Sequence, residues 1–180
     1  MSDSPGGFYV QLEKNTNGTF KLIEKDESYT TFDASGKIVN AMDANNNKTT
    51  YTYSGNKLVS VTDPSGRKMT ISYGSNGKVS SIVDPANREY KYTYDAASNL
   101  TGYSETDSKR TVTQNTGYGY DAKHQMTSYT DEKGKKLFMT YNTEKQLIKY
   151  EQPVTIAGAL QKDYYTLSYN ESTGVTIKRC

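Results

Sequence analysis

One short motif recurs along the chain and sets the period of whatever the chain folds into. An aromatic residue is followed by four or five turn-forming residues and then by an aliphatic residue, as in 94-YDAASNL-100. Four of the six intervals between successive aromatic residues are 20 or 21 residues long, and the two longer ones contain candidate insertions at 111–117 and 154–161. A fixed period of this length predicts a tandem array of one supersecondary unit. The seven aromatic positions are Phe32, Tyr53, Tyr73, Tyr94, Tyr120, Tyr141 and Tyr169, and the aliphatic positions are Ile38, Leu58, Val79, Leu100, Met126, Leu147 and Val175.

Each unit contains a second turn, which divides it into two strands. The loops at this turn, such as 63-DPSGRK-68, combine an acidic residue with Pro, Gly or Asn, and these residues favour tight turns. Between turns, large side chains alternate with polar ones, as Tyr90, Tyr92 and Tyr94 do. A period of two is typical of a strand with two unlike faces. The sequence therefore predicts an all-β fold of tandem antiparallel hairpins, each about 21 residues long.

The strand after each aliphatic residue has a less regular pattern. Leu58 and Val61 are three positions apart, as are Leu100 and Tyr103, and this spacing puts them on opposite faces of a regular strand. Either both faces are partly covered, or a β-bulge turns one residue of each pair to the other face. The sequence is compatible with both.

The spacing of strands limits how the tyrosines can contact one another. Strands lie about 4.8 Å apart, so equivalent tyrosines of successive two-strand units lie roughly 10 Å apart. Ring contacts need about 4.5–7 Å between centroids. We therefore expect side chains of the intervening strand, with the aliphatic position the natural candidate, to fill the space between equivalent rings.

The domain organisation follows from the extent of the repeat. Residues 1–7 are expected to be a flexible lead, and residues 8–180 a single array in which 32–180 hold about seven units. Residues 8–31 read as atypical starting strands with a hairpin turn at Asn17-Gly18, since repeat arrays commonly begin with an atypical unit. The opening MSDSPGG lacks the charged and apolar regions of a signal peptide, so we interpret it as the start of a cut-out fragment.

Composition argues against several classes of partner. The net charge is +2, from 22 basic and 20 acidic residues, so no strong field attracts nucleic acid or anionic lipid. No stretch approaches the roughly 18 apolar residues of a membrane span, so no membrane insertion is expected. The mean hydropathy of −0.85 is low, but 17 tyrosines supply large apolar faces. Cys180 is the only cysteine, which excludes an intrachain disulfide and reads either as an engineered thiol or as a boundary accident.

Residues for catalysis or cofactor binding are scarce. The only histidine, His124, lies in a turn where other repeats carry Ser98, Lys145 or Thr173, so we expect no enzyme activity and no cofactor. The run 43-DANNN-47 resembles the start of a calcium loop, but Lys48 occupies the position where such a loop needs Gly, so no metal is expected.

The tyrosines themselves are the candidate ligand-binding residues. Tyr103, Tyr129 and Tyr150 could form a platform for cell-wall glycan. The competing interpretation is that these rings bury one another in the sheet.

The motif resembles the YD repeat of bacterial Rhs and wall-associated proteins over roughly residues 8–178. The stretch 92-YTYDAASNLTGYSETDSKR-110 carries the clearest match, although only Tyr94-Asp95 and Tyr120-Asp121 keep the literal pair. The resemblance implies a sheet that spirals into a hollow shell, which in large relatives, including teneurins and insecticidal toxin-complex components, encloses a polypeptide such as a toxic C-terminal domain. Seven units are too few to close a shell, so this chain would be a curved, open segment of its wall. The family's C-terminal core motif with its self-cleaving aspartates is not found in this sequence, so autoproteolysis is carried over to no residue.

Two functions follow from this resemblance. The first is a non-catalytic structural segment of a secreted or cell-surface protein, whose partners are neighbouring repeats and a C-terminal toxin cargo. The alternative is a cell-surface adhesive module that binds carbohydrate or protein partners through its tyrosine-rich sheet. In either case the edge strands of an open array invite self-association.

Overall fold

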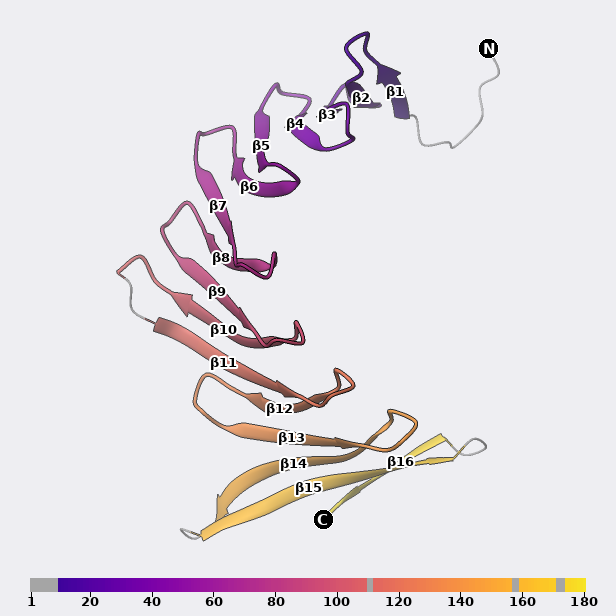
Figure 1. The fold of residues 1–180 in the computed structure, drawn as a ribbon, viewed down its shortest axis with the longest axis vertical. Coiled ribbons are helices and arrows are strands. Elements are labelled where there is room, and N and C mark those ends of the chain that lie inside the picture. Colours follow the sequence, from indigo (N-terminus) through magenta and orange to yellow (C-terminus); the bar gives the residue numbers. More distant parts are fainter. Residues whose placement is uncertain (1–9, 110–111, 157–158, 171–173) are drawn as a thin grey trace. The chain divides into compact units, whose positions relative to one another are not determined.

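The computed structural model describes residues 10–109, 112–156, 159–170 and 174–180, and this part of the chain contains sixteen β-strands and no helix. The strand order in the sheet is the chain order, β1 to β16 (Figure 1). The strands are β1 (Val10–Lys14), β2 (Phe20–Glu24), β3 (Tyr29–Phe32), β4 (Ile38–Met42), β5 (Lys48–Ser54), β6 (Lys57–Thr62), β7 (Lys68–Tyr73), β8 (Val79–Val83), β9 (Glu89–Tyr94), β10 (Leu100–Thr106), β11 (Val112–Tyr120), β12 (Met126–Thr130), β13 (Lys136–Tyr141), β14 (Leu147–Ile156), β15 (Ala159–Asn170) and β16 (Gly174–Arg179).

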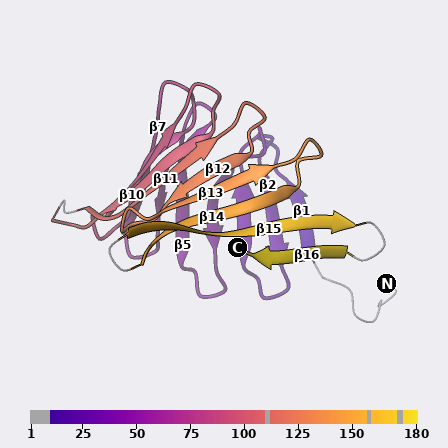
Figure 2. The ribbon, with the colours of Figure 1, turned by 90° about the horizontal axis from the view of Figure 1, so that it is seen from below.

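The chain divides into two units, each described by itself. The first comprises the residues up to Ser72 together with Ile82–Asn87, and the second comprises Tyr73–Ser81 and the residues from Arg88 onward. In the first unit β1 to β7 pair antiparallel, each with the next. In the second unit β9 to β16 do the same, and both views show β11 to β15 side by side (Figures 1 and 2). The predicted all-β array of antiparallel hairpins is confirmed.

Seven of the described repeat turns have the same hydrogen-bonding scheme. In the turn 95–99 the amide of Asp95 donates to the carbonyl of Asn99 at 3.0 Å, and the amide of Ser98 donates to the carbonyl of Asp95 at 3.0 Å. The fourth residue of this five-residue turn takes a positive φ, which is 71° at Ser98. Glycine adopts this conformation at no steric cost, whereas other residues pay for it. The same scheme occurs at 33–37, 43–47, 63–67, 121–125, 131–135 and 142–146.

A β-bulge follows the turn of the motif and explains the spacing of three. Leu58 lies opposite Tyr53 and Ser60 lies opposite Thr52, so Val59 is an extra residue in β6. Because of this extra residue Val61 lies opposite Tyr51, and Leu58 and Val61 therefore share one face. Of the two explanations that the sequence allowed, the structure has the bulge. Equivalent register shifts occur between Thr31/Phe32, Leu100/Gly102, Gly119/Tyr120 and Thr140/Tyr141.

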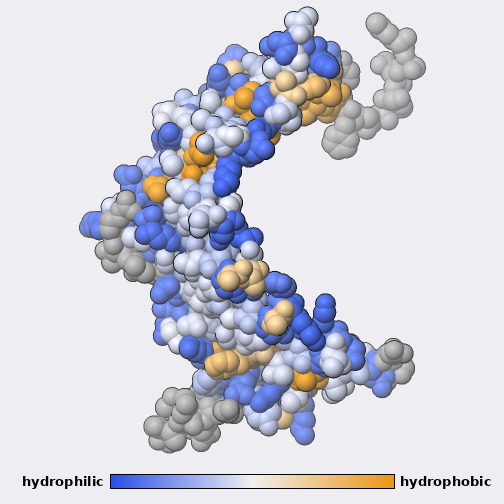
Figure 3. Space-filling view, viewed as in Figure 1, coloured by the Kyte–Doolittle hydropathy of each residue, from blue (hydrophilic) through white to orange (hydrophobic). Residues whose placement is uncertain are grey.

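The sheet has no enclosed hydrophobic core. Among the described residues no hydrophobic side chain is fully buried, and Ser60 and Thr106 are the only residues that are largely shielded from solvent. The two faces nevertheless differ, since exposed and half-buried residues alternate along β7 and β13. The visible surface is mostly hydrophilic with scattered hydrophobic residues (Figure 3). Contacts between neighbouring strands must therefore supply the stability that a core supplies elsewhere.

Candidate functional site

The aromatic and aliphatic positions of the repeat lie opposite each other in six of the seven repeats. Tyr53 lies opposite Leu58 in the sheet, and both are placed there by the turn and bulge between them. For the third repeat, Tyr73 ends β7 and Val79 begins β8. We name the side of each unit that carries these pairs the repeat face. The other facing pairs are Phe32–Ile38, Tyr94–Leu100, Tyr120–Met126, Tyr141–Leu147 and Tyr169–Val175.

The three tyrosines predicted as a ligand platform each pack against another tyrosine in the second unit. The ring centroids of Tyr92 and Tyr103 are 5.7 Å apart, as are those of Tyr118 and Tyr129. Tyr150 and Tyr165 are 6.1 Å apart. All six rings are half-buried, and such tilted pairs gain about 0.5–1.5 kcal/mol beyond the area they bury. The rings therefore serve first as cross-strand contacts.

Tyrosine hydroxyls also link successive repeats. Tyr141 donates a hydrogen bond to the carbonyl of Met126 at 2.9 Å, and Tyr169 donates to the carbonyl of Leu147 at 2.8 Å. In both cases an aromatic repeat residue binds the aliphatic repeat residue of the preceding unit, at the start of its bulge. Sequence reasoning missed these bonds because they join residues of different repeats, and nothing in the motif specifies how one hairpin is aligned with the next.

We expect Tyr141→Phe to lower the free energy of unfolding by about 1 kcal/mol, the usual net contribution of one hydrogen bond. The ring and its contact with Leu147 remain, so the loss reports the hydroxyl alone. Tyr120→Phe is the matched control, because within the described residues the Tyr120 hydroxyl makes no hydrogen bond, and it should change stability by less than about 0.5 kcal/mol. Urea unfolding followed by circular dichroism measures both, and equal effects of the two variants would contradict the assigned role.

His124 links two turns of the second unit. Its Nδ1 lies 2.6 Å from Oδ1 of Asn99, and Nδ2 of Asn99 donates to Oδ2 of Asp95 at 2.8 Å. The side-chain hydrogen bond from Asn99 is the largest of the effects that lower the pKa of Asp95, and the charge of His124 adds a smaller one. His124 thus lies in a network that connects the turns of two repeats.

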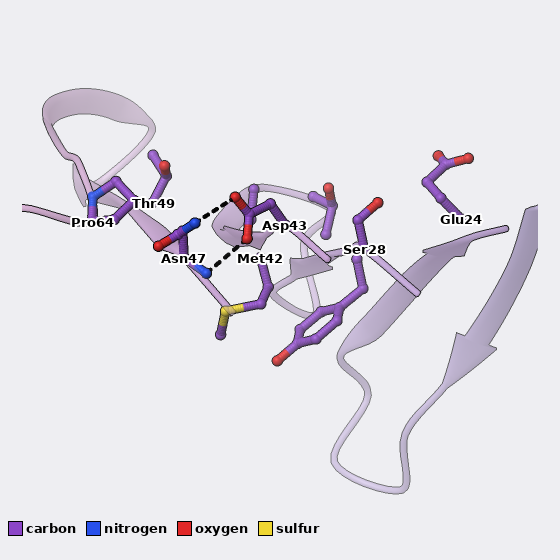
Figure 4. Close-up of a pocket in the computed structure, with 10 residues that line it drawn as sticks. Glu24, Ser28, Met42, Asp43, Asn47, Thr49 and Pro64 are labelled. Atoms are coloured by element: carbon purple, nitrogen blue, oxygen red, sulfur yellow. Dashed lines mark hydrogen bonds between the residues drawn. The ribbon is translucent and has the colours of Figure 1, made fainter. Parts of the chain in front are cut away.

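The Asp43 turn borders a cavity of about 310 Å³ in the first unit (Figure 4). Asp43 uses both carboxylate oxygens within its own turn: Oδ1 accepts from the amide of Asn47 at 2.8 Å and Oδ2 from Nδ2 of Asn47 at 2.8 Å. These bonds, the side-chain one foremost, lower the pKa of Asp43. No group of three or more potential metal ligands occurs among the described residues. The carboxylate is therefore committed to its turn.

A second cavity, which we call the tyrosine groove, lies in the second unit. Its volume is about 420 Å³, and it is lined by Tyr103, Thr116, Tyr118, Tyr129, Asp131, Glu132 and Lys133. The groove brings together two residues of the predicted platform, Tyr103 and Tyr129, but Tyr150 does not line it. Burial raises the pKa of Tyr103, and the charge of Glu105 raises it further. The groove offers aromatic faces beside carboxylates and an ammonium group.

Two further features concern the rest of the described chain. Cys180 is exposed and forms no disulfide. Nowhere in the described ranges is there a helix of the length and apolarity that crossing a membrane requires.

Comparisons with known proteins agree with this architecture. The family model described as Teneurin YD-shell matches residues 6–91, and the one described as RHS Repeat matches residues 73–112. No curated protein matches the chain in sequence.

Solved structures resemble the chain in fold. "Crystal Structure of TcdB2-TccC3-Cdc42" matches with a TM-score of 0.69 at 16% identity, over 96% of this chain and 11% of the other. "Crystal Structure of TcdB2-TccC3 without hypervariable C-terminal region" matches with a TM-score of 0.67 at 16% identity, over the same shares. This chain thus spans about a tenth of the length of these proteins. The two family models, Teneurin YD-shell and RHS Repeat, thus match residues 6–112 between them, and the chain is similar to proteins of these repeat families.

Proposed function

We propose that this chain is a non-catalytic segment of a shell wall that encloses a polypeptide carried by the same protein. The observation that carries the proposal is the likeness in fold, over 96% of the chain, to TcdB2-TccC3. One of these structures is described as lacking a hypervariable C-terminal region, so the relative carries such a region. By analogy, the cargo here would be a C-terminal toxin, and the parent protein would be secreted or exposed on a bacterial cell surface.

The geometry supports a mechanical role. Each interior strand of a unit is paired on both sides, so within a unit the sheet leaves no gap in its backbone ladder. Bonds such as Tyr141 to Met126 and His124 to Asn99 add side-chain links between repeats. A wall needs this continuity, because an opening between strands would admit protease to the cargo.

Protection from protease tests the proposal on the parent protein that contains this array. The polypeptide that follows the repeats should resist trypsin while the array is folded. It should become cleavable when the sheet is broken by Tyr129→Pro, because proline removes a ladder hydrogen bond in the middle of a sheet. Tyr129→Phe is the matched control and should leave the cargo protected. Cleavage at the same rate in all three proteins would refute enclosure.

The tyrosine groove favours one alternative function, an adhesive module that binds cell-wall glycan. Aromatic faces beside Asp131 and Glu132 combine stacking surfaces with hydrogen-bond acceptors. On this hypothesis Glu132→Ala, which leaves the ring pairs intact, should weaken retention on a cell-wall glycan panel. Unchanged tyrosine fluorescence and no retention across the panel would remove the alternative.

A further inference from the structure

The two outermost strands of the sheet expose apolar residues at alternate positions. On β16, Val175 and Ile177 are 53% and 64% exposed. On β1, Val10 and Leu12 are 45% and 64% exposed. Within the described chain each of these strands has one hydrogen-bonded neighbour, β15 for β16 and β2 for β1. An edge strand with exposed apolar residues is a template for pairing with another strand.

The two edges are of different kinds. In the interior of each unit, a strand that begins at an aliphatic repeat residue is followed by a strand that ends at an aromatic one, as β12 is followed by β13. β16 carries the aliphatic residue Val175, so within the described chain it has no neighbour that ends at an aromatic repeat residue on its open edge. We call a strand that ends at an aromatic repeat residue an aromatic kind of strand, and one that begins at an aliphatic repeat residue an aliphatic kind. β1 is of the aromatic kind: Lys14 lies opposite Phe20 across the turn 15–19, as Tyr53 lies opposite Leu58. The open edge of β1 therefore lacks a strand of the aliphatic kind.

Five interior junctions share one register. In each of them the residue two positions after the aliphatic residue lies opposite the residue three positions before the next aromatic one, whereas the β2–β3 junction, at the atypical start of the array, has another register, with Lys21 opposite Thr31. Five junctions follow this rule, with the pairs Asn40–Thr50, Ser60–Thr70, Gly102–Gly117, Ser128–Phe138 and Lys149–Thr166.

The register of these five junctions can be applied to β16 and β1. The last hairpin has no bulge, since Tyr169 pairs with Val175 and Ser168 with Thr176. Thr176 therefore takes the place that the residue after the bulge takes elsewhere, and its partner would be Gln11. In an antiparallel pair this puts Val175 opposite Leu12 and Ile177 opposite Val10. All four exposed apolar side chains then meet, on the repeat face.

We propose that β16 of one copy of this chain pairs with β1 of a second copy, head to tail, in the register that these five interior junctions share. Such a contact joins two different surfaces, so each added copy leaves the same two edges open. The product is a series of oligomers of increasing length. The proposal uses only the edges and holds whether or not the array encloses a cargo.

Sedimentation equilibrium with a reductant present, which prevents disulfides through Cys180, tests the proposal. The average mass should rise with concentration from the 20.1 kDa of the monomer and should not level off at a dimer. A constant mass of 20.1 kDa over the accessible range would overturn it.

Two variants that each block one edge test the polarity of the contact. Ile177→Lys and Leu12→Lys replace largely exposed side chains with a charged one, which protects edge strands from pairing. Each variant alone should stay monomeric, whereas an equimolar mixture should form dimers and nothing larger, because only one competent pair of edges remains. If Leu12→Lys alone associates like the unmodified chain, β16 pairs with itself and the proposal is wrong.

Phe138→Lys is the matched control. Phe138 is 40% exposed but lies on β13, which has a strand on each side. This variant should associate as the unmodified chain does. An equal loss of association in all three variants would mean that exposed apolar residues, not strand edges, drive the contact.

Discussion

Tyr118→Ala is expected to lower the free energy of unfolding by about 2–4 kcal/mol, the largest loss we expect from the truncation of a single side chain. Truncation of a fully buried aromatic residue costs about 3–5 kcal/mol. Tyr118 is half-buried, so about half of that applies, and the ring pair with Tyr129 at 5.7 Å adds about 0.5–1.5 kcal/mol. In a sheet without a buried core, no other layer can take over these contacts.

The ring of Tyr118 can be separated from its hydroxyl. Tyr118→Phe keeps the ring pair and removes only the hydroxyl, which lies 3.2 Å from Oγ1 of Thr116. We expect it to cost less than about 1 kcal/mol. Urea unfolding followed by circular dichroism compares the two variants. If both lose the same stability, the ring pair contributes nothing and the interpretation of the tyrosine rows as cross-strand contacts fails.

The hairpins could be predicted from the sequence because the features that determine them are local. Turn residues and the alternation of side chains act within a few residues, so 94-YDAASNL-100 already contains the turn and both facing residues. Not all of the turn was foreseeable: Ser98 and Lys145 take a positive φ that glycine fills more readily, at Gly36 for instance. At Ser98 and Lys145 the hydrogen bonds of the turn outweigh the preference of the single residue for a negative φ.

The bulge and the links between repeats could not be derived in the same way. A spacing of three between Leu58 and Val61 fits either a bulge or two covered faces, because periodicity records only which residues are large. The bond from Tyr169 to the carbonyl of Leu147 spans 22 positions and depends on how one hairpin lies beside the next. The tyrosine groove is likewise formed by residues of different strands, and no local pattern marks its lining.

Acid should destabilise this protein through its turns. The pKa of Asp33 is lowered by the hydrogen bond from the Ser35 hydroxyl and by the amide of Lys37, and the pKa of Asp43 is lowered by the bonds from Asn47. A carboxyl whose pKa is lower in the folded than in the unfolded state adds stability above its unfolded pKa of about 3.9, and this stability is lost as the pH falls through the folded value. Unfolding midpoints in urea should therefore hold from pH 7 to about pH 5 and fall steeply below about pH 4.

Asp33→Asn tests this mechanism at one turn. Three donors, the amides of Ser35 and Lys37 and the hydroxyl of Ser35, all bind Oδ1 of Asp33, so an amide oxygen can keep the same bonds. Asn142 already does so in this chain, accepting from the amide of Gln146 at 2.8 Å. The variant should fold at pH 7 and lose less stability on acidification. An asparagine cannot bind the proton that Asp33 binds more readily in the unfolded state than in the folded state. Glu132→Gln removes an equal charge from a side chain that accepts no hydrogen bond within the described residues, so it should leave the acid slope unchanged. If it flattens the slope as much as Asp33→Asn, the acid sensitivity comes from net charge and not from the turns.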